Sequence, residues 1–423
     1  MNIKTIIYRL LFAAIAIAAA TPAATGSEPS VPFDTISARL DYQRYVFPQE
    51  KIHVTTDQGR YVTGDTIWLR AWVTDAASGH QVNASKYVYV ELLSPFGKVE
   101  KRIKIREDNG LYSGYLDLDE ELPEGNYTLA AYTTFMEGLG TDYFFRKPLG
   151  VISPYSTQAE IVTTFEPTDN DESLKMNLSF QDREGKPLHY ETMYVTSSTE
   201  KQMEGGRGTR TRNFTLKRKD FPERVALVQL DHYKKYIVLP PKEGLLDVTF
   251  HPEGGYLIPG VPCKVGFKAI DGAGAGVDVT GVITTSRGDT VANLQTIHKG
   301  IGSVILLPIE GERYTAHING HTFELPATNA EAAVIHADNS KGDYLDITPV
   351  GNVPDGAMVV VQSHGVARYA APAEKGKTYR VPATELGDGV VQILLMTADL
   401  QPLSERLIFN YPAHDTILSV TRR

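Results

Sequence analysis

The chain has 423 residues, with 42 Lys and Arg against 51 Asp and Glu, so its formal net charge is −9. This acidic balance disfavours a dedicated nucleic-acid or anionic-membrane binder, because both need a basic face. The single cysteine, Cys263, excludes an intramolecular disulfide and a four-cysteine zinc site. It stands where a strand is expected to begin, which favours a buried structural thiol over an activated nucleophile.

The first residues form an export signal. Lys4 and Arg9 precede an uncharged apolar run over residues 10–20, and small residues follow as far as Ser27. The run is too short for a stable membrane anchor, and no cysteine stands near the cut to carry a lipid. We therefore expect an exported chain that is periplasmic or outer-membrane-associated, with no transmembrane segment in its mature part. The near-absence of cysteine in an exported protein fits a bacterial periplasm.

Strands and turns are predicted over nearly all of the remaining sequence. A leader over residues 27–50 includes one short helix near residues 35–45, and period-two alternation dominates from Lys51 onward. In residues 67–73, for example, Ile67, Leu69, Ala71 and Val73 alternate with Trp68, Arg70 and Trp72. Turn residues recur every 8–12 positions, which is typical of antiparallel sandwiches. The predicted fold is all-β, a tandem array of about four immunoglobulin-like sandwiches.

An internal repeat organises these sandwiches. Residues 61–69 align with residues 257–265, and Gly110 and Ser113 align with Gly300 and Ser303. Further on, Tyr127 aligns with Tyr314. Two copies of one sandwich explain this order, with the shared glycines expected to supply positive φ angles or tight reversals.

Short proline-rich segments suggest where the modules end. The predicted boundaries are 1–26 for the signal peptide, 27–50 for the leader, 51–154 for sandwich 1, 155–245 for sandwich 2, 246–327 for sandwich 3 and 328–423 for sandwich 4.

Residues 48–76 resemble the opening strands of macroglobulin domains of the alpha-2-macroglobulin family. The matching residues are Glu50, Lys51, Thr56, Asp57, Tyr61, Gly64, Asp65, Thr66 and Ile67. Residues 123–133 resemble the final strands of that module, and residues 251–271 resemble a later one. The resemblance implies macroglobulin-like sandwiches at 51–154 and 246–327. It also implies a periplasmic protein of the Gram-negative kind in which such modules often precede a TonB-receptor plug domain.

The resemblance has departures. The family's thioester needs a Cys-x-Glu-Gln segment, whereas Cys263 is followed by Lys264, Val265 and Gly266. Thioester chemistry is therefore not expected. The last residues, 416–423, look like a linker into a further module, so we expect a truncated member of this kind.

One basic segment is a candidate binding loop. Residues 201–219 carry several cations, with Gly205 and Gly206 interpreted as a mobile hairpin tip. Such a loop would suit anionic glycans, lipopolysaccharide or an acidic partner, whereas the alternative is a solvated loop. The candidate residues are Arg207, Arg210, Arg212, Lys217 and Arg218.

The sequence predicts no metal site at its histidine pair or at its acidic clusters. His317 and His321 flank Asn319-Gly320, a two-residue hairpin turn that places the imidazoles on opposite faces. The acidic clusters around Asp169, Asp171 and Glu172, and around Asp117, Asp119, Glu120, Glu121 and Glu124, lack the complete spacing of a calcium loop. We expect no metal, cofactor or catalytic residue.

The two tryptophans, Trp68 and Trp72, share one face of a strand, and core packing is favoured for them over an exposed stacking platform. The leading prediction is a non-enzymatic envelope scaffold or binding protein, associated with TonB-dependent uptake. Its partner is an envelope protein, such as a TonB-dependent receptor, or a glycan. The alternative is a polysaccharide-binding protein that uses loop aromatics such as Trp72, Tyr112 and Tyr115. A hydrolase with a spatially assembled site is the third hypothesis.

Overall fold

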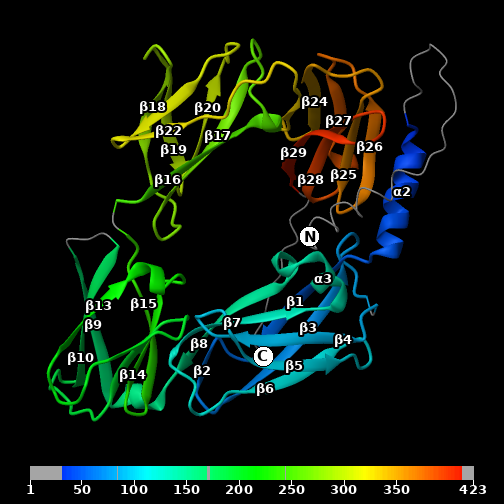
Figure 1. The fold of residues 1–423 in the computed structure, drawn as a ribbon. Coiled ribbons are helices and arrows are strands. Elements are labelled where there is room, and N and C mark those ends of the chain that lie inside the picture. Colours follow the sequence, from blue (N-terminus) through cyan, green and yellow to red (C-terminus); the bar gives the residue numbers. More distant parts are fainter. Residues whose placement is uncertain (1–30, 83, 169–171, 243, 412–423) are drawn as a thin grey trace. The chain divides into compact units, whose positions relative to one another are not determined.

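The computed structural model describes residues 31–411 except 83, 169–171 and 243. Its regular secondary structure is almost entirely antiparallel strands, which surround four separate apolar cores and confirm the predicted all-β tandem sandwiches (Figure 1). The chain divides into two compact units: Tyr45–Leu245 is one, and Met1–Arg44 together with Leu246–Arg423 is the other. Each unit contains two sandwiches.

Sandwich 1 packs a three-stranded sheet, in the order β1-β3-β6, against a five-stranded sheet, in the order β2-β8-β7-β4-β5. Its elements are β1 (Glu50–Thr56), β2 (Arg60–Val62), β3 (Thr66–Asp75), β4 (Tyr87–Leu93), β5 (Val99–Arg106), β6 (Tyr112–Asp117), β7 (Gly125–Tyr132), α3 (Thr134–Leu139), η1 (Thr141–Tyr143) and β8 (Phe145–Ile152). Strand β3 alternates as predicted, with Ile67, Leu69, Ala71 and Val73 buried. The intervening side chains therefore point away from the core.

Sandwich 2 follows within the same unit. Its sheets have the orders β13-β10-β9 and β12-β11-β14-β15. Its elements are η2 (Pro154–Thr157), β9 (Ala159–Pro167), β10 (Ser173–Asp182), β11 (Met193–Thr196), β12 (Gln202–Glu204), β13 (Arg212–Lys217), η3 (Arg218–Asp220), β14 (Val225–Leu230) and β15 (Tyr233–Val238). Since β12 and β13 belong to different sheets, the chain between them crosses from one layer to the other.

Sandwich 3 is one continuous seven-stranded sheet, in the order β16-β17-β20-β19-β18-β21-β22. Its elements are β16 (Leu246–Pro252), η4 (Glu253–Gly255), β17 (Cys263–Asp271), β18 (Thr280–Thr285), β19 (Thr290–His298), β20 (Ile301–Leu306), β21 (Tyr314–Ile318) and β22 (His321–Glu324). Strand β19 shifts register between Thr296 and His298, where it passes from β20 to β18. The two halves of the sheet thereby enclose one core.

Sandwich 4 has the sheets β23-β24-β27 and β26-β25-β28-β29. Its strands and short helix are β23 (Ala333–Asp338), β24 (Tyr344–Gly351), β25 (Met358–Ser363), β26 (Val366–Pro372), β27 (Tyr379–Pro382), η5 (Ala383–Glu385), β28 (Gly389–Met396) and β29 (Pro402–Asn410).

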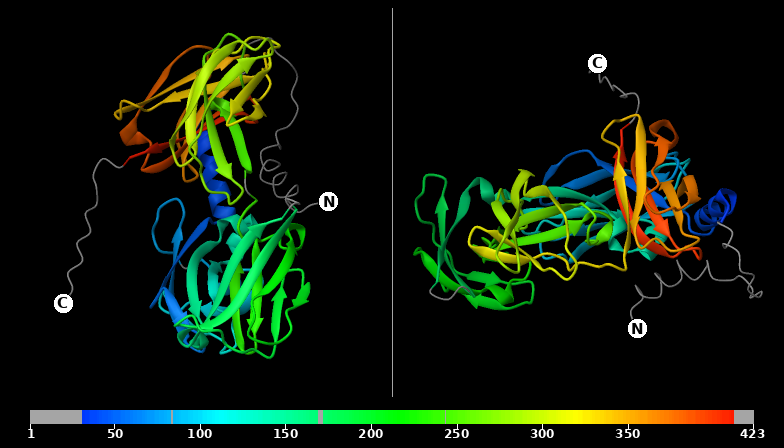
Figure 2. Two further views of the ribbon diagram at one scale, coloured as in Figure 1. Left: turned by 90° about the vertical axis from the view of Figure 1, so that its left-hand side faces the viewer. Right: turned by 90° about the horizontal axis from the view of Figure 1, so that it is seen from above.

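The predicted short helix is α2 (Phe33–Val46). Its buried Ile36 packs with Met358, Val360 and Leu400, so the helix covers the outer face of the β26-β25-β28-β29 sheet. Figures 1 and 2 show α2 beside these strands. The segment predicted as a leader therefore contains a helix that packs on sandwich 4, far away in sequence.

The strand register confirms the internal repeat. Ile67 pairs with Leu116 in sandwich 1, and Cys263 pairs with Leu306 at the aligned position of sandwich 3. Sheet β1-β3-β6 thus corresponds strand for strand to β16-β17-β20. At one aligned cross-strand pair, the large and the small residue stand on opposite strands in the two copies. Ala71 on β3 faces Tyr112 on β6 in the first copy, whereas Phe267 on β17 faces Gly302 on β20 in the second.

The repeated glycines have the backbone angles that the sequence predicted. The φ angle is +87° at Gly64 and +74° at Gly260, and it is +81° at Gly110 and +77° at Gly300. Non-glycine residues rarely adopt these angles, so the glycines fix the same turns in both copies.

Three sandwiches share a buried tyrosine whose hydroxyl forms a hydrogen bond with the main chain of the turn just before it. The hydroxyl of Tyr127 donates to Pro123 O at 2.8 Å, and that of Tyr314 accepts from Ile309 N at 2.9 Å. The hydroxyl of Tyr379 accepts from Glu374 N at 2.9 Å, so this feature also occurs in sandwich 4, outside the sequence repeat. Such tyrosine corners recur in immunoglobulin-like sandwiches.

Sandwiches 1 and 2 are joined through Glu124, which follows Pro123 and precedes Gly125. Its carboxylate pairs with Lys235 at 2.8 Å and accepts a hydrogen bond from the Tyr233 hydroxyl at 3.2 Å. Its backbone N–H and C=O bond to Lys234 O and Tyr236 N, both at 2.8 Å. Main-chain and side-chain bonds together fix this joint.

Sandwiches 3 and 4 are joined through a second Pro-Glu-Gly tripeptide, Pro252–Gly254. The Glu253 carboxylate lies 3.1 Å from Arg406 Nε. The Ser404 hydroxyl donates to Gly254 O at 2.8 Å and accepts from Ile335 N at 3.1 Å. Within each unit, the acid of a Pro-Glu-Gly turn therefore meets a cation of the following sandwich.

No helix in the described part of the chain is long and apolar enough to cross a membrane.

Candidate functional site

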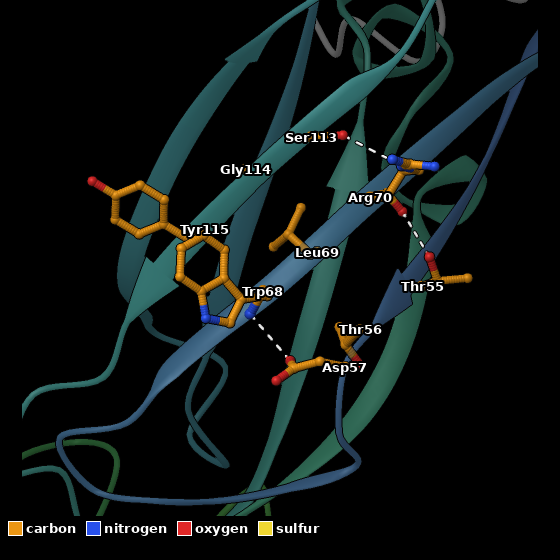
Figure 3. A pocket seen from close by; sticks show the side chains of 9 residues that line it. All are labelled: Thr55, Thr56, Asp57, Trp68, Leu69, Arg70, Ser113, Gly114 and Tyr115. Carbon is orange, nitrogen blue, oxygen red and sulfur yellow. Dashed lines mark hydrogen bonds between the residues drawn. The ribbon is translucent and has the colours of Figure 1, made fainter.

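The outer face of the β1-β3-β6 sheet carries both tryptophans of the chain. Figure 3 shows Trp68 on this face beside Tyr115 and Arg70. Trp68 is 58% exposed and Trp72 is 37% exposed, and Tyr115 on β6 is 55% exposed. The prediction that the tryptophans pack in the core is wrong. Their β-strand neighbours fill the core instead, and strict alternation leaves both indoles on the solvent side.

The exposed aromatic rings are ordered by their neighbours. Trp68 pairs directly across the sheet with Tyr115, and the ring centroids are 5.4 Å apart at an interplanar angle of 47°. Between the two tryptophans, the Arg70 guanidinium lies 5.5 Å from the Trp72 ring centroid. Arg70 Nε also donates to Ser113 Oγ at 3.3 Å. The indoles are about 13 Å apart along β3, from the strand rise of about 3.3 Å per residue.

A fixed negative charge lies at one end of this face. Asp57 Oδ1 accepts hydrogen bonds from the Tyr61 hydroxyl at 2.6 Å and from the Trp68 backbone N–H at 3.1 Å. Partial burial opposes ionisation of the carboxyl, but these hydrogen bonds prevail and lower the pKa of Asp57. The carboxylate is therefore ionised at neutral pH beside the Trp68 ring.

These side chains line a shallow, open groove of about 550 Å³. The lining residues are Thr55, Thr56, Asp57, Trp68, Leu69, Arg70, Ser113, Gly114 and Tyr115. Hydroxyls, a carboxylate and a guanidinium thus surround the aromatic rings. Across the described residues of β1, β3 and β6, no outward-facing side chain is aliphatic. The groove can offer ring stacking and hydrogen bonds to one ligand.

The second copy of the repeat shows that this aromatic face is not a requirement of the fold. At the positions of Trp68 and Trp72, β17 carries Lys264 and Lys268, and β20 carries Ile305 in place of Tyr115. The same register thus forms without any of these three aromatic side chains. The sequence contained this signal, because aligning the two copies outside their shared motifs separates the core positions from the surface positions.

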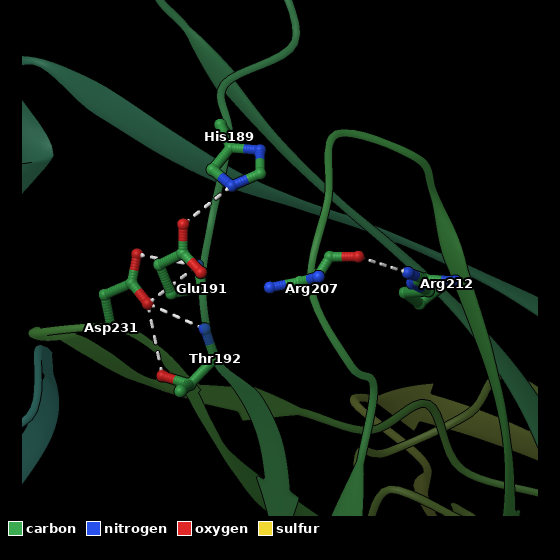
Figure 4. Close-up of polar contacts among 6 residues, drawn as sticks. All are labelled: His189, Glu191, Thr192, Arg207, Arg212 and Asp231. Atoms are coloured by element: carbon green, nitrogen blue, oxygen red, sulfur yellow. Dashed lines mark hydrogen bonds and ion pairs between the residues drawn. The ribbon is translucent and has the colours of Figure 1, made fainter.

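The candidate basic loop is only partly available to a ligand (Figure 4). Arg212 donates through Nε to the Tyr190 hydroxyl at 2.9 Å and through Nη2 to Arg207 O at 2.6 Å. Arg218 donates to Pro240 O at 2.9 Å. Two of the five candidate guanidinium or ammonium groups therefore hold the sandwich together, whereas Arg207, Arg210 and Lys217 are exposed.

The interpretation of Gly205-Gly206 as a hairpin tip is wrong. These glycines follow β12 on the crossing between two sheets. A Cβ on Gly205 would lie 2.6 Å from Met193 Sδ and 2.9 Å from the Phe214 ring, so this glycine is packed against the core. The chain directly before β11 is held by Asp231, whose carboxylate accepts a hydrogen bond from Thr192 N at 2.8 Å (Figure 4).

The other aromatic and sulfur candidates divide into core and surface. Tyr112 is completely buried and donates to Ser85 O, so its prediction as a loop aromatic is wrong. Trp72 and Tyr115 are exposed but lie on strands and not in loops. Cys263 is buried in the core of sandwich 3 as expected, and burial raises the pKa of its thiol.

The histidine and acidic candidates are dispersed. His317 pairs with Thr322 and His321 pairs with Ile318, which confirms the predicted hairpin register and puts the imidazoles on opposite faces. Asp169 and Asp171 lie outside the described residues. The cluster near residue 120 is spread out, because Glu121 pairs with Lys234 and Glu124 belongs to the joint between sandwiches. Sequence reasoning missed that joint, since the cations lie more than 100 residues away.

No protein-family model matches the sequence, and no curated protein matches it. Among solved structures, trypsin-activated alpha-2-macroglobulin from Escherichia coli is 12% identical with a TM-score of 0.29, over 87% of this chain and 31% of that one. Salmonella alpha-2-macroglobulin reacted with methylamine is 12% identical with a TM-score of 0.30, over 92% of this chain and 31% of that one. An Escherichia coli adhesin is 11% identical with a TM-score of 0.24, over 66% of this chain and 98% of that one.

The chain spans less than a third of the length of these alpha-2-macroglobulins. At such values the comparisons do not identify a family. The sandwich class rests on the strands and cores of the chain itself.

Proposed function

We propose that this chain is an exported, non-enzymatic binding protein of the bacterial cell envelope, and that it holds a polysaccharide on the outer face of the β1-β3-β6 sheet. The observation that carries the proposal is the pair of exposed tryptophans. They stand at positions where the second copy of the same sandwich has lysines.

Polysaccharide is the ligand class that best suits the chemistry of this face. A sugar ring has apolar C–H faces that stack on indole and phenol rings, and its hydroxyls bond to carboxylates, guanidinium groups and hydroxyls. Trp68 and Tyr115 supply stacking surfaces, and Asp57, Arg70 and Thr55 supply polar partners between them. The lack of outward aliphatic side chains favours a hydroxyl-rich ligand over a protein partner.

The envelope location rests on the predicted export signal and the scarcity of cysteine. Association with a TonB-dependent receptor rests on the resemblance of residues 48–76 and 123–133 to macroglobulin modules. In this proposal the remaining sandwiches act as spacers and contact modules that present the polysaccharide-binding face.

Tryptophan fluorescence offers a direct test, because the chain has only two tryptophans and both lie on this face. We expect soluble laminarin, xylan or mannan to change the emission saturably, with at least one of them binding. Replacing Trp68 by lysine, the residue of the second copy, should weaken binding about tenfold or more, which corresponds to about 1.4 kcal/mol.

Tyr344 provides a matched control. It is an exposed aromatic residue on β24 with the Arg380 guanidinium 5.6 Å from its ring, the same arrangement as Arg70 over Trp72. Tyr344→Ala should leave binding unchanged, whereas Trp72→Ala should weaken it. Equal effects of the two substitutions, or no response to any polysaccharide, would contradict the proposal.

A further inference from the structure

The charges on the outer face of the β1-β3-β6 sheet are separated along β3. The Arg70 guanidinium lies over the Trp72 ring. Lys51 on β1 is exposed on the same face, and in the strand register it is a diagonal neighbour of Trp72. The Asp57 carboxylate, in contrast, accepts a hydrogen bond from the backbone of Trp68. One end of the aromatic face is therefore cationic and the other end is anionic.

Arg70 has a neutral partner on the neighbouring strand. Its Nε donates to Oγ of Ser113, the residue directly opposite in the register (Figure 3). In the part of the chain that the structure describes, no carboxylate forms an ion pair with Arg70. The remaining N–H groups of a guanidinium match the two oxygens of a carboxylate, so Arg70 can bind a carboxylate of a ligand.

A second arginine of the chain shows that a carboxylate fits this arrangement. Arg380 lies 5.6 Å from the Tyr344 ring centroid, as Arg70 lies 5.5 Å from that of Trp72. The residue directly opposite Arg380 is Asp346, whose two oxygens accept hydrogen bonds from Nε at 2.7 Å and from Nη2 at 2.8 Å. Arg380 thus binds a carboxylate of its own sheet, whereas the residue opposite Arg70 is a serine.

The second copy of the repeat shows that the fold does not require this arginine. Gly266 stands at the position of Arg70, and Ser303 is directly opposite, as Ser113 is in the first copy. The serine is present in both copies and the register is the same, although only one copy has the arginine. Formation of the sheet therefore does not explain the presence of Arg70.

We infer that the polysaccharide bound on this face is acidic, and that Arg70 binds a carboxylate of the sugar next to Trp72. This inference rests on the polysaccharide-binding function proposed above. The two indoles are about 13 Å apart along β3, so they contact different sugars of one chain. Asp57 would repel a carboxylate at Trp68 and accepts hydrogen bonds from sugar hydroxyls instead. The ligand therefore combines uronate with neutral sugars.

The test titrates the whole chain with hyaluronan and with glucuronoxylan, which both contain glucuronate among neutral sugars. Each polymer is compared with its own carboxyl-reduced form, which has the same linkages without the charge. We expect tryptophan emission to show about threefold to tenfold tighter binding of at least one acidic form, from one exposed charge-assisted contact. The net charge of −9 opposes non-specific binding of a polyanion, so such a preference requires a local cation.

Two variants locate that contact. Arg70→Gln removes the charge and should abolish the difference in affinity between the acidic and the reduced form. Arg146→Gln is the matched control, because Arg146 is an exposed arginine on β8, in the other sheet of the same sandwich. The control should keep the full difference.

The outcomes separate this inference from the proposed function. Equal affinity for the acidic and the reduced forms would overturn the inference, while binding itself would still support the proposed function. No response to any polysaccharide, acidic or neutral, would contradict both. A preference that Arg70→Gln leaves unchanged would overturn the role of Arg70. Binding of dextran sulfate as tight as that of the acidic polymers would overturn the assignment of a carboxylate.

Discussion

Gly254 lies in the joint between sandwiches 3 and 4, where one added carbon atom would meet closely packed neighbours. A Cβ at this position would lie 2.6 Å from Val334 Cβ, 3.0 Å from Ser404 Oγ and 3.1 Å from Ile335 O. The φ angle of +75° adds backbone strain of about 1–2 kcal/mol for alanine. Overpacking against a fixed neighbour adds about 1–3 kcal/mol. Alanine also restricts the unfolded chain more than glycine does, which favours the folded state by about 0.4–1 kcal/mol.

Gly254→Ala should therefore weaken the joint by about 1–5 kcal/mol, the sum of these contributions. Gly255→Ala is the matched control, because Gly255 also has a positive φ angle, +100°, but a Cβ there meets nothing within 4 Å. The control should carry the strain and the same unfolded-state gain, but no overpacking.

Hydrogen exchange of β23 and β29 in the whole chain is the suitable assay, because a chain with several cores need not unfold in one step. Gly254→Ala should reduce the protection of both strands by more than Gly255→Ala does. If the two variants lose equal protection, the close packing of Gly254 does not stabilise the joint.

The remaining predictions concern sandwich 1, its joint with sandwich 2, and the tyrosine corner of sandwich 3. Glu124→Gln removes the ion pair with Lys235 and should cost about 1–2 kcal/mol, discounted for partial exposure; unchanged proteolytic nicking between the two sandwiches would contradict this. Burial, helped by the hydrogen bond that it donates to Glu91, raises the pKa of Tyr132 to about 12. Because this exceeds the ordinary value of 10, the stability contributed by the neutral hydroxyl is complete below pH 10 and is lost as pH rises toward 12. Urea unfolding followed by tryptophan fluorescence should show that loss, and Tyr132→Phe should reduce the slope; an equal slope in the variant would refute the assignment. Tyr314→Phe should cost about 0.5–1.5 kcal/mol by removing the bond to the turn, measured by hydrogen exchange of β21, and unchanged exchange would refute it.

Patterns with a short period predicted the fold well. The alternation in residues 67–73 placed the buried residues of β3 correctly, and Asn319-Gly320 fixed the register of its hairpin. Shared glycines revealed the repeat because the backbone angle at Gly64 and Gly260 tolerates few other residues. These features depend on local geometry, which the sequence specifies directly.

The site was harder to predict, since exposure depends on what lies over a strand. The size of an indole favours burial in general, yet the core positions next to Trp68 and Trp72 were already filled. Phe267 and Gly302 stand in the second copy where the first copy has Ala71 and Tyr112. The residue types at these aligned core positions therefore differ, and a residue-by-residue comparison of the two copies does not reveal that the positions correspond. The contact of Glu124 with Lys235 joins sandwiches that are distant in sequence, and no local pattern marks it.

The most direct test of the account is the tryptophan emission of the chain during titration with soluble polysaccharides. The account predicts a saturable change with at least one of them. Each single variant, Trp68→Lys or Trp72→Lys, should weaken that binding about tenfold or more while the chain stays folded. An emission spectrum that no polysaccharide changes, together with recovery of an outer-membrane protein that both variants fail to bind, would show that the aromatic face is a protein-docking surface and would contradict the account.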